Sequence, residues 1–396
     1  TDLAIGTPHT GSFIGGGQAE LFRFVLPESN AFEAVLDDAA TNNVNELYVK
    51  FGAPPTRSDY DHRFLDPTAS DQRILVPQAY AGTWYILVYG DTIRTAGDYT
   101  LTAQEFDVRV TSVTPDHFGA ADGATLTITG GGFLPSSTVE LVRGGQVLGE
   151  AETVTYFSAR HLQAEIDLTG IAPGTAAIRV TSLGATGETD FQVTAPTPAN
   201  LETRLVVPSS VRTGSPATVW LEYENTGQLA MEAPLLVVSA RQNANHYASL
   251  SPASGLQIVF ADGRGTTLPM PDPRALWTMA MPEGYGNTVQ VLGSGSVPGL
   301  LQPGESVRYP IQWAGWRGPV NWGLPITFTL GVVEPGNTEA IDWADMKDDM
   351  RPDALDLATW DVLWQGFTAE AGDTWGSYVD MLQENAVYLG RQGLWV

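Results

Sequence analysis

The sequence has no cysteine, and lysine occurs only at Lys50 and Lys347. Without cysteine the chain can form no disulfide, thiolate metal site or thiol nucleophile. Twenty basic residues face 45 acidic ones, so the net charge is −25. Such a surface repels phosphate backbones, and we therefore do not expect nucleic-acid binding. No apolar run approaches the roughly 18 residues of a membrane span, and no signal peptide precedes the polar start at Thr1. We expect a mature chain or an excised fragment without membrane insertion.

The excess of acidic residues has two interpretations. An acidic surface attracts cations, which makes calcium a candidate cofactor, and it also keeps a protein soluble in a saline exterior where salt screens repulsion. The absence of cysteine is compatible with large bacterial surface proteins. We therefore expect an extracellular or cell-surface location in a bacterium. At 396 residues and 43% hydrophobic composition, the chain is long and apolar enough for two to four packed domains.

The clearest pattern is the strand Gly82-Thr-Trp-Tyr-Ile-Leu-Val-Tyr-Gly90, which is bounded by glycines and rich in aromatic and β-branched residues. Trp84 and Val88 share one face, and Tyr85 and Tyr89 share the other. Because both faces are apolar or aromatic, we expect a core strand that is packed on both sides. Neighbouring strands are predicted at residues 20–25, 46–51 and 98–102.

Four segments of the first 105 residues form a recognisable set: Gly17-Gln-Ala-Glu-Leu-Phe-Arg-Phe24, Leu47-Tyr-Val-Lys-Phe-Gly52, Tyr60-Asp61 and Gly82-Thr-Trp-Tyr85. Through them, residues 1–105 resemble the bacterial pre-peptidase C-terminal domain, a small secreted β-sandwich that is appended to exported proteins. The resemblance implies an accessory, non-catalytic module.

Four acidic residues in turn-like segments of this first domain are candidate calcium ligands. They are Asp37, Asp38, Asp59 and Asp61. Calcium takes six to eight oxygen ligands, commonly from Asp and Asn in loops. The acidic residues that lead the strand in calcium-binding relatives are here Val44-Asn45-Glu46, and solvated turns are the simpler interpretation.

A second set of strand and turn patterns follows at Val110–Pro115, Gly123–Gly130, Gly132-Phe133, Leu162–Leu168, Ala172–Gly174 and Ala177–Thr181. Gly130, Gly131 and Gly132 permit a tight bend before Phe133, which we expect to fill the interior of the sandwich. Through these segments, residues 106–194 resemble the immunoglobulin-like IPT/TIG domain, which implies a spacer. The basic loops with which transcription-factor members bind DNA are missing.

A proline-rich linker is predicted at 195–199, within Thr194-Ala-Pro-Thr-Pro-Ala199. Residues 200–337 are predicted to form a third sandwich, which begins with Leu201–Pro208 and continues through the Gly turn, alternating strand and Asn-Thr-Gly turn of Gly214–Gly227. Over these first forty residues the chain resembles bacterial CARDB-like adhesion domains. Strands are expected at 234–240, 256–260, 306–313 and 325–333, with a long irregular insertion over 261–303. This insertion is rich in Gly and Pro.

Residues 338–396 form an acidic stretch with helical spacing. Trp360, Trp364 and Phe367 recur at i, i+4 and i+7, and a second apolar stripe begins at Trp375. Asp373 or Thr374 can cap the second helix, and Gly390 or Gly393 can end it. We predict a helical hairpin packed on the third sandwich, with Trp360, Trp364 and Trp375 buried near Trp313 and Trp322.

No catalytic motif is present. The five histidines are scattered singly, and no HExxH, GxSxG, phosphate-binding or dinucleotide-binding sequence occurs. Paired carboxylates have no diagnostic weight in so acidic a chain. We therefore predict that the protein is not an enzyme. Trp313, Trp316 and Trp322 could form an aromatic platform for sugar rings, but packing at the junction between the third sandwich and the helices is the simpler interpretation.

The prediction is a mostly-β protein: three jelly-roll or immunoglobulin-like sandwiches in series, then a helical hairpin. The function it indicates is that of a non-catalytic structural or adhesive region of a larger bacterial surface or secreted protein. Its partners would be other domains of that protein, with glycans or a protein at the helical end. The alternative is an accessory carbohydrate-binding region of a secreted hydrolase.

Overall fold

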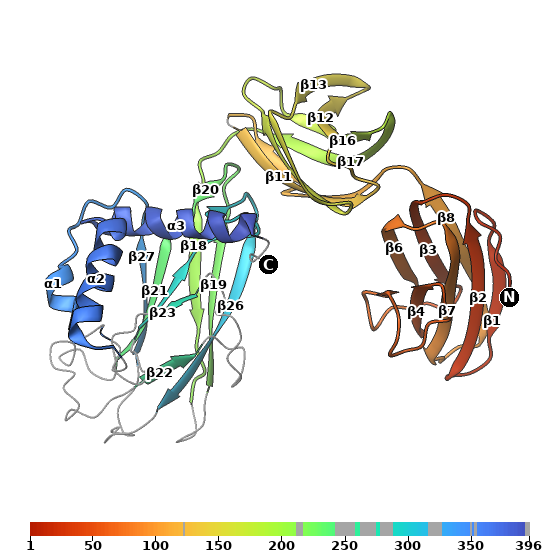
Figure 1. The fold of residues 1–396 in the computed structure, drawn as a ribbon, viewed down its shortest axis with the longest axis horizontal. Helices are drawn as coiled ribbons and strands as arrows, with labels where there is room; N and C mark the ends of the chain where they lie inside the picture. Colours follow the sequence, from red (N-terminus) through yellow and green to blue (C-terminus); the bar gives the residue numbers. More distant parts are fainter. Residues whose placement is uncertain are drawn as a thin grey trace. The chain divides into compact units, whose positions relative to one another are not determined.

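The computed structural model describes residues 1–121, 123–210, 217–241, 258–261, 275–277, 288–315, 327–348, 351 and 355–392 (Figure 1). Within these residues the chain is mostly β with helices at its C-terminal end, which confirms the predicted fold class. It separates into two compact units, Thr1–Ala195 and Pro196–Val396, and the boundary lies in the proline-rich segment. No helix in the described part of the chain is both long enough and apolar enough to cross a bilayer.

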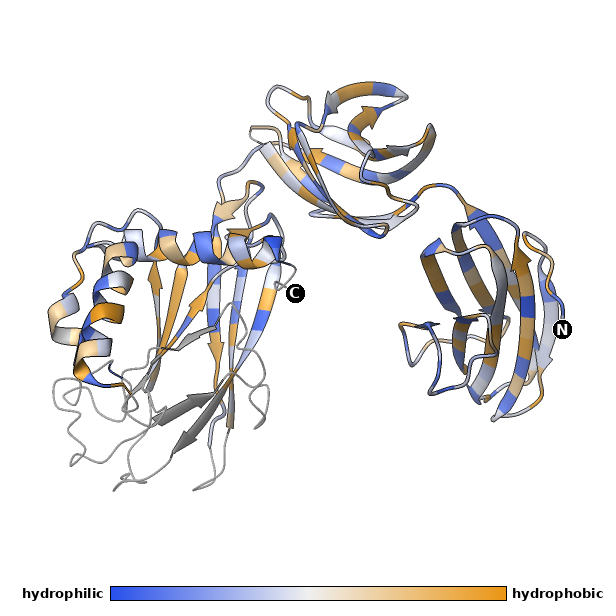
Figure 2. Cartoon of the chain, viewed as in Figure 1, coloured by the Kyte–Doolittle hydropathy of each residue, from blue (hydrophilic) through white to orange (hydrophobic). Residues whose placement is uncertain are grey.

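The first sandwich consists of two antiparallel sheets, with strand orders β2-β7-β4-β5 and β1-β8-β3-β6. Its sequence alternates between apolar and polar residues, which Figure 2 shows as alternating colours along the strands. The strands are β1 (His9–Phe13), β2 (Gln18–Leu26), β3 (Asn30–Asp38), β4 (Val44–Phe51), β5 (His62–Arg63), β6 (Gln72–Ala79), β7 (Gly82–Thr92) and β8 (Gly97–Phe106).

Strand β7 is central in its sheet, as predicted, but it is not packed on both sides. Trp84 and Val88 are buried in the core of the sandwich, whereas Tyr85 and Tyr89 on the other face are half-buried. The prediction was wrong for this outer face because no second layer from the described part of the first unit covers it. The Arg57 guanidinium lies over the Tyr89 ring instead, 4.3 Å from its centroid. Tyr89 therefore makes a cation–π contact on this face and does not pack in a core.

The second sandwich pairs a five-stranded sheet, β10-β17-β16-β12-β13, with a four-stranded sheet, β14-β15-β11-β9. Phe133 is fully buried, as expected. The strands are β9 (Arg109–Thr114), β10 (His117–Gly119), β11 (Gly123–Gly131), β12 (Thr138–Arg143), β13 (Gln146–Glu150), β14 (Thr153–Ser158), β15 (His161–Asp167), β16 (Gly174–Ser182) and β17 (Ala185–Thr194).

The second unit contains the sheets β18-β19-β26-β22 and β23-β24-β21-β27 and the pair β20-β25. The passage 261–303, expected to be irregular, contains β24, which pairs with β21 in the sheet interior. The sequence of β24, Thr-Val-Gln-Val-Leu, alternates only briefly between polar and apolar residues. Because it stands between glycine-containing stretches, the pattern did not indicate a strand. The strands are β18 (Leu201–Val206), β19 (Ala217–Asn225), β20 (Met231–Glu232), β21 (Leu235–Arg241), β22 (Ile258–Ala261), β23 (Ala275–Trp277), β24 (Thr288–Leu292), β25 (Leu300–Leu301), β26 (Ser306–Gly315) and β27 (Thr327–Val333).

Three helices follow: α1 (Trp343–Met346), α2 (Leu357–Ala371) and α3 (Trp375–Arg391). Thr374, one of the two predicted N-caps, caps α3 through a reciprocal capping box with Ser377. The helix does not end at Gly390 but continues to its C-cap at Gln392. Helix α3 lies across the end of the sandwich (Figure 1).

The contact between α3 and the sandwich uses aliphatic residues rather than the predicted tryptophans. Val379 and Leu382 of α3 pack against Leu235 and Leu292 at the ends of β21 and β24. Trp364 of α2 is buried, but the rings around it belong to the helical end itself: Trp343, Trp360 and Phe367. Trp360 and Trp375 are only half-buried, so the prediction that both would be buried was wrong.

Candidate functional site

The four predicted calcium ligands do not form one group. Asp37 and Asp38 lie at the end of β3, whereas Asp59 and Asp61 lie between β4 and β5, which belong to the other sheet. Asp59 forms an ion pair with Lys50. Asp61 accepts a hydrogen bond from the Phe51 backbone N–H at 2.8 Å.

Asp38 is almost fully buried and is surrounded by donors. One of its oxygens accepts from the Ala40 backbone N–H, and the other accepts from the side-chain amides of Asn43 and Asn45, at 2.7–3.0 Å. A carboxylate in such a shell of N–H groups does not suit a cation, which needs lone pairs directed toward it. No group of three or more His, Asp or Glu side chains suited to a metal occurs in the described residues. Calcium binding therefore stays a prediction.

The predicted tryptophan platform lies largely outside the described residues. Trp316 and Trp322 fall in the stretch 316–326, of which the structure gives no description. The backbone of Trp313 belongs to β26 and lies opposite Ala217 of β19 and Phe260 of β22. The platform therefore stays a prediction.

The most distinctive site is the joint between the two sandwiches of the first unit. Glu33 of β3 is 4% exposed although it carries a carboxylate. Arg109, the first residue of β9 in the second sandwich, donates a charge-assisted hydrogen bond to one of its oxygens. Arg73 of β6 approaches the other oxygen at 3.1 Å, as an ion pair rather than an aligned hydrogen bond. A buried carboxylate thus depends on a cation from each side of the joint.

The glycines before Phe133 allow the second sandwich to approach the first closely. A side chain on Gly132, whose φ is +78°, would meet the Asp107 carbonyl at 1.8 Å, and one on Gly131 would meet the Phe106 ring at 2.9 Å. The Gly132 N–H donates to the Pro77 carbonyl of β6 at 3.0 Å. The predicted tight bend therefore also serves as a contact surface between domains.

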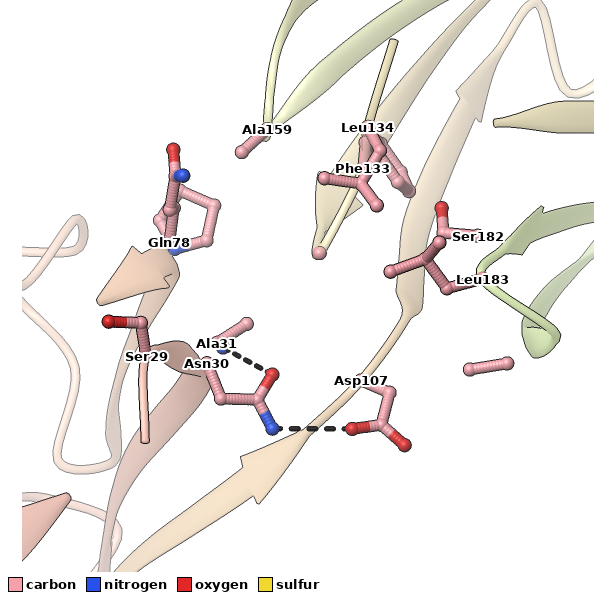
Figure 3. A pocket seen from close by; sticks show the side chains of 13 residues that line it. Ser29, Asn30, Ala31, Gln78, Asp107, Phe133, Leu134, Ala159, Ser182 and Leu183 are labelled. Atoms are coloured by element: carbon pink, nitrogen blue, oxygen red, sulfur yellow. Dashed lines mark hydrogen bonds between the residues drawn. The ribbon is translucent and has the colours of Figure 1, made fainter. Parts of the chain in front are cut away.

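A groove of about 400 Å³ opens beside this joint (Figure 3). Figure 3 shows Asn30 and Asp107 along one side of the space, with Phe133, Leu134 and Ala159 facing them from the other. The Asn30 amide donates to the Asp107 carboxylate at 3.2 Å. The groove is lined by Ser29, Asn30, Ala31, Pro77, Gln78, Asp107, Gly132, Phe133, Leu134, Ala159, Ser182, Leu183 and Ala185.

Leu183 borders the groove in an unfavourable backbone conformation. It and Gly184 form the two-residue turn between β16 and β17, with φ values of +50° and +88°. Such turns favour Asn or Gly at both positions, because at positive φ the Cβ atom approaches the following carbonyl oxygen, a clash that Gly avoids and Asn offsets through local hydrogen bonds. The Leu183 side chain is 89% exposed, so no packing within the described residues of the first unit compensates for this strain.

The groove is acidic. Asp107 is the one ionisable residue that lines it, and exposed Glu28 precedes Ser29 in the adjacent turn. Arg160 follows the lining residue Ala159 and is close to His62 of the first sandwich: burial lowers the pKa of His62, the charge of Asp61 opposes this shift, and the charge of Arg160 adds to it.

Two aromatic side chains are exposed at the same end of the first sandwich. The rings of Phe51 and Tyr80 lie 6.0 Å apart with an interplanar angle of 55°, and Tyr80 is 70% exposed. Neither this pair nor the groove was predicted from the sequence. The only local signal was the pair Leu183-Gly184 between two alternating strands, where Asn-Gly is expected.

No family model matches the chain, and no curated protein does. Solved structures to which it is similar include the pre-peptidase C-terminal domain of collagenase from Bacillus anthracis, with 16% identity over 26% of this chain and 91% of that one, at a TM-score of 0.22. The TIG domain of human nuclear factor of activated T-cells, cytoplasmic 4 is another, with 22% identity over 22% of this chain and 88% of that one, at a TM-score of 0.20. The adhesin InvE from Yersinia pseudotuberculosis is a third, with 14% identity over 57% of this chain and 55% of that one, at a TM-score of 0.18. The two domain types predicted for residues 1–194 are thus among these structures, each over about a quarter of the chain.

Proposed function

We propose that the chain is a non-catalytic region of a larger bacterial surface or secreted protein, with a structural or adhesive role outside the cell. Its partners would then be the neighbouring domains of that protein and a surface or molecule that it contacts. The observation that supports this proposal is the joint between the first two sandwiches. A spacer must hold its domains in one orientation, and this joint has the features of a rigid connection.

Three kinds of contact contribute to that rigidity. Glu33 forms ion pairs with Arg73 of the first sandwich and Arg109 of the second. The glycines before Phe133 permit close backbone contact, and the Arg109 guanidinium lies 4.8 Å from the centroid of the Phe106 ring. Removing one partner of a buried ion pair leaves an uncompensated charge, so the arrangement disfavours separation. Domains connected by a flexible linker alone would lack such contacts.

Spin labels test the proposal directly, because the natural chain has no cysteine. Ser12→Cys in β1 and Gln146→Cys in β13 place one label on each sandwich at exposed positions. We expect a narrow distance distribution by double electron–electron resonance and a broader one after Glu33→Gln. Glu188→Gln is the matched control, because it removes the exposed ion pair with Arg179 inside the second sandwich. A broad distribution in the unsubstituted pair contradicts the rigid-spacer role.

We infer a second candidate function, carbohydrate binding, from the exposed pair of Tyr80 and Phe51. Aromatic faces of this kind stack on sugar rings. A glycan array tests this candidate: saccharide-dependent signal that Tyr80→Ala abolishes and Leu65→Ala retains would favour it. Leu65 is a suitable control because it is 78% exposed in the same sandwich and carries no ring. An array without signal favours the purely structural role.

A further inference from the structure

We infer that the groove between the first two sandwiches binds a short extended peptide segment that carries an apolar side chain next to a lysine or arginine. This inference deepens the proposed function and rests on it, because it identifies the contact through which a structural segment would also be adhesive.

The dimensions of the groove suit a short peptide. Its volume of about 400 Å³ lies at the lower end of the roughly 300–1,000 Å³ that is typical of ligand sites. It therefore admits a few residues of an extended chain and no folded element. The joint holds its walls in place, since the first sandwich contributes one side and the second the other. A preformed groove lowers the entropic cost of binding.

The lining separates into an apolar part and an acidic part. Leu134 and Leu183 provide the accessible apolar surface, since Phe133 and Ala159 of the lining are buried, and Asp107 provides the charge. Among the described residues the Asn30 amide is the one partner of the Asp107 side chain, and it occupies a single oxygen. The Asp107 residue is exposed, so its other oxygen is accessible to a cation. A net charge of −25 adds a long-range attraction for basic partners.

Leu183 supplies the independent observation. A leucine at positive φ is unfavourable for folding, and one that is 89% exposed gains nothing from packing against the described residues of this unit. Strained residues that the fold does not require concentrate at functional sites. Leu183 lies on the side of the groove opposite Gln78 (Figure 3), where it would contact an apolar side chain of a bound peptide.

A saccharide fits this groove less well. Sugar sites present accessible aromatic faces, but the one aromatic ring in the lining, Phe133, is fully buried. The exposed rings of Phe51 and Tyr80 are not among the lining residues. The carbohydrate candidate and the peptide groove are therefore separate surfaces, and variants can distinguish them.

Fluorescence anisotropy on the full chain tests the inference with three capped, fluorescein-labelled heptapeptides. The first has a central leucine flanked by lysines, the second has glutamates in place of the lysines, and the third has serine in place of the leucine. We expect saturable binding of the first peptide, weaker at higher salt, and weaker binding of the other two. Asp107→Asn should raise its Kd about two- to fivefold, as for an exposed ion pair. Leu183→Asn should raise it about five- to tenfold through lost apolar contact.

Two control variants match these changes away from the groove. Asp190→Asn removes one exposed charge from β17, and Leu65→Asn replaces an exposed leucine of the first sandwich; both should leave the Kd unchanged. The inference is wrong if the lysine peptide shows no saturable binding at millimolar concentration. It is also wrong if the glutamate peptide binds as tightly as the lysine peptide, or if the control variants raise the Kd as much as the groove variants do. Competition by a neutral oligosaccharide overturns the peptide class. The spin-label distances report on the joint alone, so a failed groove and a failed spacer role are distinguishable.

Discussion

At the scale of single residues, positive φ occurs at Leu183 and at several glycines, and the two cases have different causes. Gly132 cannot carry a side chain because the Asp107 carbonyl occupies that space. Leu183 has open space around it, and its conformation is imposed only by the two-residue turn. Packing therefore requires a glycine at position 132, whereas the fold tolerates Leu183 at a cost in backbone strain.

Replacing Leu183 with Asn should therefore stabilise the first unit. Asn-Gly is the preferred sequence for a turn with two positive φ values, and we expect the free energy of unfolding to rise by about 0.5–1 kcal/mol. Denaturant unfolding followed by circular dichroism measures the change. Leu65→Asn, also at an exposed leucine but without positive φ, should leave the midpoint unchanged. A lower midpoint for Leu183→Asn would show that the leucine contributes packing.

Calcium is the second prediction at this scale. A bound ion at Asp37, Asp38, Asp59 or Asp61 would stabilise the folded state by about 2.7 kcal/mol at a hundredfold excess over Kd. Thermal melting in calcium is compared with melting in sodium at equal ionic strength. A higher midpoint in calcium supports binding, and Asp37→Asn should reduce that difference. Equal midpoints leave only general charge screening.

At the scale of elements, α2 and α3 differ in how they stabilise the helical end. Helix α3 is amphipathic and places Val379, Leu382 and Ala386 against the end of the sandwich. Helix α2 has no comparable stripe: it buries Trp364 and Ala371 but leaves Val362 70% exposed. The burial of Trp364 among other rings therefore accounts for most of the apolar packing of α2.

Trp364→Ala should lower the free energy of unfolding of the second unit by about 3–5 kcal/mol, as expected for a core aromatic. Val362→Ala, on the same helix but exposed, should change it by less than about 0.5 kcal/mol. Denaturant midpoints measure both variants, and sedimentation mass shows whether association changes. If Trp364→Ala kept its midpoint but lost an association, the ring would serve a partner instead of the core.

The stability of the α3 contact should also depend on alkaline pH. Burial raises the pKa of Tyr378 to about 12, and its hydroxyl hydrogen-bonds to the Gln290 side chain of β24 at 3.0 Å. The folded state therefore favours the neutral phenol, and this contribution is complete below the unfolded pKa near 10 and is lost as pH rises through about 12.

We expect the free energy of unfolding of the second unit to fall by on the order of 2 kcal/mol over this alkaline range. Tryptophan fluorescence follows the transition, because Trp84 is the one tryptophan of the first unit. Tyr378→Phe should show a shallower fall. An identical pH dependence for this variant and the natural chain would assign the effect to other groups.

At the scale of the whole molecule, the chain consists of two units that each have their own cores. The boundary segment is short and exposed, although the Thr197 carbonyl accepts a hydrogen bond from the Gln228 backbone N–H of the second unit at 3.2 Å. A segment without buried side chains adds little cooperativity between two units.

Residues 1–195 and 196–396 should therefore fold when they are expressed separately. Calorimetry of the two fragments should give transitions that together reproduce those of the full chain, and circular dichroism should show β structure in each. An unfolded C-terminal fragment would contradict the independence of the units. A shifted transition in the full chain would reveal a stabilising contact between them.

The sequence by itself determined the local structure of this protein. Alternation predicted β2, β4, β7 and β8, apolar spacing predicted both long helices, and Thr374 was one of two predicted caps. These features depend on neighbours one to four residues away, so a pattern in the chain contains them. The absence of cysteine likewise excluded thiol chemistry, and the repeated alternation predicted a mostly-β chain.

Only the tertiary structure decided the joint and its groove. Glu33 and Arg109 are 76 residues apart in the chain, and the groove combines segments from Ser29 to Ala185. In the sequence Glu33 resembles any charged residue of a strand, and Asp107 resembles any linker acid. Their roles follow from which residues the fold places opposite them, and burial and pairing across domains leave no periodic signal along the chain.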